Sequence, residues 1–392
     1  MKRQRLFSYV VAFLAAASPG SVAPQKVPIQ LGPTHFALES RIGGDSSSIA
    51  FHQIAGIAAA PSEFYVVDYF NHSIRAFDYS GRLRREFGRQ GSGPGEFVAP
   101  ARLRLSGDTL LSVDDLSLRR TTWFTTAGRY LTSDEMPTRD RIGRRITQQL
   151  VPLRSGTVVG YETYLIGSVG SSDVDPNSYV ILIHSDARVD TLATIPLSIG
   201  WYRKRGQEQF INAVPVRLGL SGGWAVSGDS MVAIVDGQIG VLRAFKIGDL
   251  GSDQEQLRRG FVMTEQVNLG WTPRQIDPRS TIDTARSILV SQRGGRPADY
   301  QVTLPTHYGL LGSIIFDDQG RIWISESDPT DPSRAPKWSI VANKQVIAVV
   351  TLNSGFRLGA VVGDRLVGSC PDESGIQRVC VLRGTVPPSE GE

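Results

Sequence analysis

The sequence predicts an all-β protein built as a β-propeller, a closed ring of small antiparallel sheets. Short segments rich in β-branched and aromatic residues recur along the 392 residues, with turn residues between them and no long heptad or strong amphipathic run. The chain also contains 41 Gly and 22 Pro, a composition that suits many turns better than many helices. Because 41% of the residues are apolar, a large core can form within one repeat-containing unit.

The first 23 residues have the organisation of a secretory signal peptide. A basic start, Met1–Arg5, precedes an apolar stretch from Leu6 to Ala17, and small residues at 15–17 and 21–23 offer cleavage sites. This apolar stretch is too short to span a bilayer stably. We therefore expect cleavage, no stable membrane span afterwards, and a periplasmic or extracellular protein.

Removal of residues 1–23 also changes what the charge implies. The segment holds Lys2, Arg3 and Arg5 and no acid, so the formal net charge of +4 falls to about +1 in the mature chain. A nearly neutral exported protein is a poor candidate for nucleic-acid binding.

Each blade should contain four strands, ordered from the ring centre outwards. The first blade, roughly residues 54–97, begins with Ile54–Ala60 and continues after a Pro-Ser-Glu turn with Phe64–Val67, Ile74–Phe77 and Leu83–Phe87. The other blades are expected at roughly 101–135, 146–195, 223–248, 311–352 and 357–382. A ring of seven blades and a β-sandwich are the remaining alternatives.

The last predicted blade, 357–382, is one strand short. The segment Phe36–Ile42 precedes the first blade as Leu83–Gly88 precedes the second, so we expect it to supply the missing outer strand. This pairing would close the ring and remove exposed sheet edges. The predicted domain thus spans 24–384, with 385–392 as a disordered tail.

One segment carries a resemblance to a known family. From Ile74 to Gly88 the sequence shows a strand, a Ser-Gly turn and a second strand, and a Gly-rich connection then leads to Phe97. This order resembles NHL repeats, the units of a six-bladed β-propeller, and the resemblance covers residues 54–131 and 311–352. It implies an exported bacterial propeller with six blades. It implies little about activity, because one fold serves many functions.

Three connections between blades are longer than a propeller needs: residues 132–150, 196–222 and 249–307. The last contains helix-compatible segments at 252–259 and 281–291. Connections from an outer strand to the next inner strand emerge on the same face as those between second and third strands. These partly helical insertions should therefore cover one mouth of the channel, where long loops often bind partners.

A carboxylate follows the second strand in five of the six predicted blades: Asp68, Asp114 (with Asp115), Glu162, Asp236 and Glu326. These carboxylates should lie around the mouth that carries the insertions. They could hold a hard cation such as Ca²⁺ or a basic ligand. They could instead pair with arginines of their own blades, Asp68 with Arg75 and Asp236 with Arg243. The sequence leaves both interpretations open.

Three further residues complete the ligand-binding set that we expect at this mouth. His72 lies in a predicted mouth loop, and Arg144 and Arg203 lie in Arg-rich parts of two insertions. Such arginines could recognise carboxylate, sulfate or phosphate groups, although runs of this kind are usually solvated loop surface.

The two cysteines, Cys370 and Cys380, flank a predicted turn at Pro371–Gly375. In an oxidising compartment such a pair is more often a disulfide than a metal site. A bridge across a loop this short would contribute roughly 3 kcal/mol in the chain-entropy model.

These patterns favour a monomeric, non-catalytic, exported NHL-like propeller that binds a protein, peptide or carbohydrate ligand through its loop-bearing face. No cofactor is predicted, and Ca²⁺ is the ion that the acidic residues would suit. The alternative is a metal-dependent hydrolase or lyase, since gluconolactonase-like and amidating-lyase-like enzymes also use six blades. Those enzymes hold a metal with acids, Asn or His from several blades, whereas the five histidines of this chain form no matching set.

Overall fold

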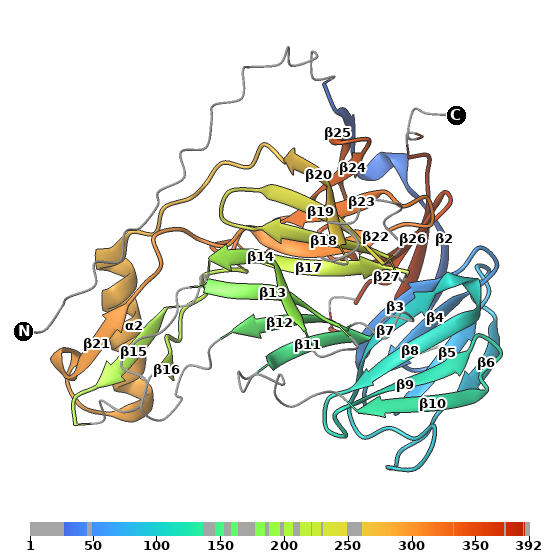
Figure 1. Ribbon diagram of the computed structural model, residues 1–392, viewed down its shortest axis with the longest axis horizontal. Helices are drawn as coiled ribbons and strands as arrows, with labels where there is room; N and C mark the ends of the chain where they lie inside the picture. The colour runs from blue at the N-terminus through green and yellow to red at the C-terminus, as the bar shows by residue number, and fades with distance from the viewer. Residues whose placement is uncertain are drawn as a thin grey trace, which may run out of the picture.

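Strands make up nearly all of the regular structure in the computed structural model of this chain (Figure 1). The structure describes residues 27–388 except for gaps at 45–48, 136–145, 153–157, 164–176, 185–187, 197–199, 207–211, 221, 229, 249–260, 332, 372–373 and 387. Within these residues, one α-helix and three short 3-10 helices accompany the strands. The protein is therefore an all-β propeller with few helices.

Five of the sheets are blades of four antiparallel strands. The first contains β3 (Ile54–Ala59), β4 (Phe64–Asp68), β5 (Ser73–Phe77) and β6 (Leu83–Phe87). The second contains β7 (Pro100–Ser106), β8 (Leu110–Asp115), β9 (Arg120–Thr125) and β10 (Tyr130–Glu135). The third contains β11 (Ile146–Pro152), β12 (Val158–Thr163), β13 (Asn177–Ile183) and β14 (Val189–Pro196). The fourth contains β17 (Gly222–Ser227), β18 (Met231–Asp236), β19 (Val241–Ile247) and β20 (Phe261–Asn268).

The C-terminal blade contains β26 (Arg357–Val362), β27 (Arg365–Ser369), β28 (Val379–Arg383) and β2 (Ala37–Ile42). The sequence predicted six blades of four strands each. The described residues form five such blades. The sheet predicted as the fifth blade has five strands, β22 (Leu311–Phe316), β23 (Ile322–Glu326), β24 (Lys337–Ala342), β25 (Gln345–Thr351) and β1 (Ile29–Leu31). The extra strand, β1, joins this sheet because its backbone pairs in parallel with β25.

Neighbouring inner strands approach closely because small residues face the next blade. A Cβ atom on Gly56 of β3 would come within 2.8 Å of the backbone nitrogen of Leu103 in β7, so a larger residue would push these strands apart. Larger apolar side chains fill the space farther out. Tyr65 and Ile74 of the first blade share one buried cluster with Leu111 of the second, and such inter-blade clusters form the core.

The ring is closed by a strand from the N-terminus, as predicted. Strand β2 pairs antiparallel with β28, from Ala37 opposite Arg383 to Ile42 opposite Val379. The Ile42 side chain is buried against the first and last blades. The carboxylate of Glu39 accepts hydrogen bonds from Arg365 at 2.8 and 3.0 Å.

The predicted disulfide is also confirmed. Cys370 and Cys380 are bonded, with their Cα atoms 5.9 Å apart. Cys380 lies opposite Gly368 in the β27–β28 pair, and the Cys370 backbone N–H bonds to the Arg378 carbonyl at 2.9 Å. The bridge therefore fastens the hairpin that receives β2.

Two insertions fold together into a unit outside the blades, at the left of Figure 1. Its sheet contains β15 (Trp201–Lys204), β16 (Asn212–Ala213) and β21 (Tyr300–Thr303), and its helix is α2 (Pro278–Arg293). We call this part of the structure the α2 unit. Asp277 caps α2 by accepting a hydrogen bond from the Arg279 N–H, and Gly294 ends it with φ of 70°. Tyr202, Leu289 and Tyr300 belong to a separate buried core in this unit.

The structure thus contains the helix expected around 281–291, but it corrects the limits of the third insertion. Residues 261–268 form β20, the outer strand of the fourth blade, so this insertion is shorter than 249–307. The helix expected at 252–259 and most of the first insertion lie outside the described residues. No helix among the described residues is both long and apolar enough to cross a membrane.

Removal of residues 24–44 should destabilise the whole ring, because it leaves the edge of β28 unpaired and removes the buried Phe36 and Ile42 side chains. Burying two such side chains contributes about 4 kcal/mol. Urea unfolding should show at least this loss. Removal of residues 24–31 alone, which deletes only β1, is the matched control and should cost much less. If the longer truncation melts at the temperature of the full-length protein, β2 does not stabilise the ring.

Candidate functional site

The second strands end at the same edge of each blade at which the inner strands begin. In the antiparallel ladders, Asp68 lies opposite Ile54, Asp236 opposite Gly222 and Glu326 opposite Leu311. We call this end of the ring the insertion face, since the connections that form the α2 unit lead into β17 and β22 here. The opposite end carries the turns from inner to second strands, and we call it the turn face.

Asp68 is fully buried at the insertion face. Its carboxylate accepts hydrogen bonds from the backbone N–H groups of His52 and Gln53 at 3.0 and 3.1 Å, and from the Asn71 side chain at 2.7 Å. Nη1 of Arg75, the predicted partner, is 3.9 Å away. The carboxylate thus holds the connection entering the first blade against the turn after β4.

Asp115 occupies the equivalent position in the second blade. It lies opposite Pro100 as Asp68 lies opposite Ile54. One oxygen accepts from the N–H groups of Val98 and Ala99 at 2.7 and 3.0 Å. The other accepts from Ser117 and Leu118 at 3.0 and 2.8 Å. The residue in register with Asp68 is therefore Asp115, and not Asp114.

The other three predicted acids differ from one another. Asp236 is buried and accepts from the Gln238 N–H at 3.0 Å, and burial raises the pKa of its carboxyl despite the nearby Arg243. Glu326 is half-buried at the end of β23. Glu162 belongs to β12, but its side chain lies outside the described part of the structure. Among the described residues, no group of three or more His, Cys, Asp or Glu could hold a metal ion.

Of the three predicted basic residues, the structure describes His72 and Arg203, which lie in different parts of the fold. His72 occupies the turn between β4 and β5 with φ of 52°, and its buried Nδ1 has no hydrogen-bond partner among the described residues. Arg203 lies in β15 of the α2 unit, opposite Gln301 of β21. Arg144 falls outside the described residues. Their predicted roles in ligand binding remain predictions.

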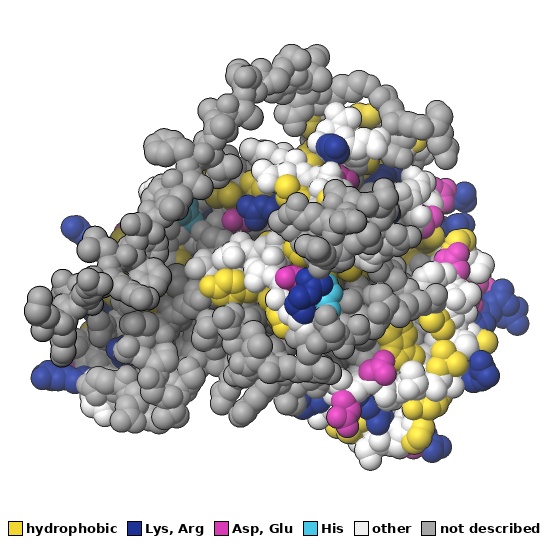
Figure 2. Space-filling model, in the orientation of Figure 1, with side chains coloured by type: hydrophobic (Ala, Val, Ile, Leu, Met, Phe, Trp, Pro, Cys, Tyr) yellow, Lys and Arg dark blue, Asp and Glu magenta, His cyan; other side chains and the backbone are white. Residues whose placement is uncertain are grey.

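Exposed apolar side chains at the insertion face are a feature that the sequence reasoning missed. Phe70, Leu116 and Ile239 follow the three buried aspartates by one to three residues, and their exposed fractions are 59%, 48% and 45%. Val98 and Leu220, in connections that enter inner strands, are exposed as well. Figure 2 shows apolar side chains on the first two blades, at the lower right of this view. The sequence contained a signal for this feature, because an apolar residue follows the carboxylate within three positions in each of these three blades.

Asp114 has a different environment from the other acids. Its fully buried carboxylate accepts two hydrogen bonds from the Arg104 guanidinium, a third from Arg102 Nη1 at 3.4 Å and a fourth from Thr121 Oγ1 at 2.9 Å. Burial lowers the pKa of Arg102, and Asp114 opposes this effect. Arg102 and Arg104 are two residues apart in β7, so they lie on one face of the strand. Two arginines at this spacing in an inner strand were the sequence signal for this cluster.

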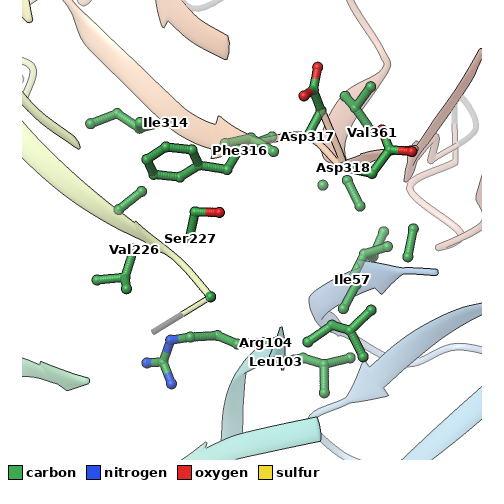
Figure 3. Close-up of a pocket in the computed structure, with 18 of the residues that line it drawn as sticks. Ile57, Leu103, Arg104, Val226, Ser227, Ile314, Phe316, Asp317, Asp318 and Val361 are labelled. Atoms are coloured by element: carbon green, nitrogen blue, oxygen red, sulfur yellow. The ribbon is translucent and has the colours of Figure 1, made fainter. Parts of the chain in front are cut away.

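Arg102 and Arg104 line a cavity of about 820 Å³ in the channel (Figure 3). Its walls come from the inner strands β3, β7, β11, β17, β22 and β26. Inner-to-second-strand turns also line it, including Gly107–Asp108 and Asp317–Asp318, so it lies toward the turn face. None of the eight ligand-binding residues predicted from the sequence is among its lining residues.

The α2 unit is tied to the blades by an ion pair at the insertion face. Nη1 of Arg274 lies 2.5 Å from an Asp328 oxygen, just after β23, and its Nη2 bonds to the Thr330 hydroxyl at 3.0 Å. Hydrogen bonding by Thr330 is the main influence that lowers the pKa of Asp328 to about 2, and Arg274 lowers it further. Asp328 is therefore ionised at neutral pH and fixes the unit to the ring.

No protein-family model matches the chain, and a search of curated proteins found no match. Among solved structures, a Bacteroides fragilis protein described as exported superposes with a TM-score of 0.51 at 10% identity, covering 92% of this chain and 100% of its own. They share a fold. A Bacteroides vulgatus protein of the DUF4221 family gives a TM-score of 0.49 at 9% identity, covering 89% and 97%. Virginiamycin B lyase from Staphylococcus aureus gives a TM-score of 0.39 at 9% identity, covering 89% of this chain and 99% of its own.

Asp115→Ala should destabilise the folded protein, because four backbone N–H groups lose their acceptor. We expect a loss of at least about 3 kcal/mol in the free energy of unfolding, measured with urea. The matched control is Asp364→Ala, which removes a half-exposed pair with Arg383 and should cost below about 1 kcal/mol. Equal stabilities for both variants would show that the Asp115 carboxylate is not structural.

Acidification should loosen the α2 unit. The pKa of Asp328 is lowered from 3.8 to about 2, so the stability that it contributes is present above its unfolded value and is lost as pH falls through about 2. Pepsin cleavage within residues 278–303, which contain α2 and β21, should therefore accelerate as the pH falls from 3.8 to about 2. Asp328→Asn should cleave fast throughout, whereas Asp364→Asn, a control away from the unit, should follow the wild type. An unchanged profile in Asp328→Asn would contradict this role.

Proposed function

We propose that this protein is an exported, monomeric, NHL-like propeller that binds a protein or peptide partner through its insertion face. In this proposal residues 1–23 are removed on export and residues 24–384 act as one binding domain. The observation that carries the proposal is the opposite orientation of two kinds of side chain at this face. The buried aspartates bond inward to backbone, whereas apolar side chains beside them are exposed.

The inward hydrogen bonds limit what the aspartates can recognise. Both oxygens of Asp68 and both oxygens of Asp115 already accept backbone N–H groups. Such carboxylates are structural, and they have little capacity left to ligate Ca²⁺ or to act as bases. This observation favours binding over the metal-dependent hydrolase or lyase.

The exposed side chains define the chemistry of the partner. Phe70, Leu116 and Ile239 lie in turns of three different blades, and Leu220 adds a fourth position in the connection that enters β17. Apolar and aromatic side chains on a rigid scaffold are typical of protein-binding surfaces. The α2 unit is connected to the ring at the same face and makes its surface uneven. An extended partner segment with its own apolar side chains fits this surface best.

The test compares two triple variants as immobilised baits in extracts of the source cells and medium, with bound proteins quantified by mass spectrometry. The insertion-face variant is Phe70→Ser, Leu116→Ser and Ile239→Ser. The control is Leu83→Ser, Leu131→Ser and Met263→Ser, which removes exposed apolar side chains of the outer strands β6, β10 and β20.

A partner held by the wild type and the control should fall at least about tenfold with the insertion-face variant, since each lost contact costs about 1 kcal/mol. Equal recovery with both variants would exclude this surface. Metal analysis of the purified protein addresses the alternative, because stoichiometric Ca²⁺ or Zn²⁺ would favour an enzyme.

A further inference from the structure

We propose that the cavity at the turn face is a second binding site, which takes a small organic anion with an apolar body. The cavity volume of about 820 Å³ lies within the range of about 300–1,000 Å³ that is usual for small-molecule sites. The site is separate from the insertion face, because it involves the opposite ends of the inner strands. It does not depend on the function proposed above.

Apolar side chains from several blades form much of the cavity wall. Ile57 and Leu103 come from the first two blades, Val226 from the fourth, Phe316 from the five-stranded sheet and Val361 from the C-terminal blade. Figure 3 shows these side chains around one central space. A ligand with a hydrocarbon body would remove this surface from water, which stabilises the complex by about 25 cal/mol for each Å² buried.

Arg104 supplies the charge that selects an anion. A guanidinium has five N–H donors. Among the described residues, Arg104 uses two of them: Nη1 and Nη2 each donate to one oxygen of Asp114. Three donors therefore have no partner among the described residues. The side chain is 22% exposed, so these donors are not sealed within the protein.

The Arg104 guanidinium is held in place before any ligand binds. Asp114 is fully buried and is itself fixed by the Thr121 hydroxyl at 2.9 Å. Preorganisation of this kind reduces the entropy lost on binding. The Ser227 side chain, at the end of β17, points its hydroxyl into the same space in Figure 3 and can donate to an anionic oxygen.

Three acidic residues line the cavity: Asp108 is exposed in the turn after β7, and Asp317 and Asp318 are engaged by other groups. Asp317 is turned to Arg321, 2.6 Å away, and to the Trp323 indole N–H at 2.9 Å. Asp318 accepts the Gly363 backbone N–H at 3.0 Å. Arg104 and Asp318 lie on opposite sides of the cavity in Figure 3, so a single anionic group can meet the arginine away from Asp318.

Isothermal titration calorimetry with a matched ligand series tests this site. Octanoate, octan-1-ol and octylammonium share the same hydrocarbon chain and differ in charge. We expect octanoate to bind at millimolar or lower concentration and at least about tenfold more tightly than octan-1-ol, with octylammonium weakest. No octanoate binding at millimolar concentration, or equal binding of octanoate and octan-1-ol, would overturn the proposal.

Two variants locate the binding. Ser227→Trp adds a large side chain to the cavity wall and leaves Arg104 and Asp114 unsubstituted, and it should weaken octanoate binding at least about tenfold. Arg104→Met removes the donors assigned to the ligand, while Arg102 and Thr121 still contact the buried Asp114 carboxylate, and it should bring octanoate to the affinity of octan-1-ol. Arg84→Met, on outer strand β6, is the matched arginine control and should bind as the wild type does.

Octanoate binding that Ser227→Trp leaves unchanged would place the ligand elsewhere and overturn the proposal. If Arg104→Met fails to fold, the ligand series and Ser227→Trp decide the question. The insertion-face triple variant should bind octanoate normally, which separates failure of this site from failure of the proposed protein-binding function.

Discussion

The arrangement of the first two blades depends on a buried carboxylate at the end of each second strand. Asp68 and Asp115 each bond to the connection that enters the blade and to the turn that follows the second strand. That connection comes from the outer strand of another blade. One carboxylate therefore holds the turn within its own blade and also the segment that links this blade to another. Burying a charge is costly unless hydrogen bonds compensate for the lost water, and here backbone donors do so.

The same hydrogen bonds determine which surfaces remain for recognition. Carboxylates that bond to backbone leave the insertion face with exposed apolar side chains as its distinctive chemistry. The channel differs, because Arg104 keeps donors for a ligand while Asp114 holds it in place. The two ends of the ring therefore suit partners of different kinds and sizes.

Much of the fold could be predicted from the sequence because strand and turn signals are local. The N-terminal strand, the disulfide and the position of α2 followed from such signals. The five-stranded sheet did not, because the short β1 segment has no pattern that specifies a parallel partner more than 300 residues away. The site was harder to predict. A one-residue difference in register separates Asp115, a structural residue, from Asp114, which faces arginines near the channel.

Ring closure also determines the order in which the chain can finish folding. Strand β2 is synthesised before any blade is complete, whereas its partner β28 follows more than 300 residues later in the chain. Pairing of Ala37 with Arg383 therefore has to await synthesis of all the strands between them, and contacts of such sequence separation form slowly. Until then the early blades exist without a closed ring. The protein therefore remains incompletely folded while every strand from β3 to β27 is being made.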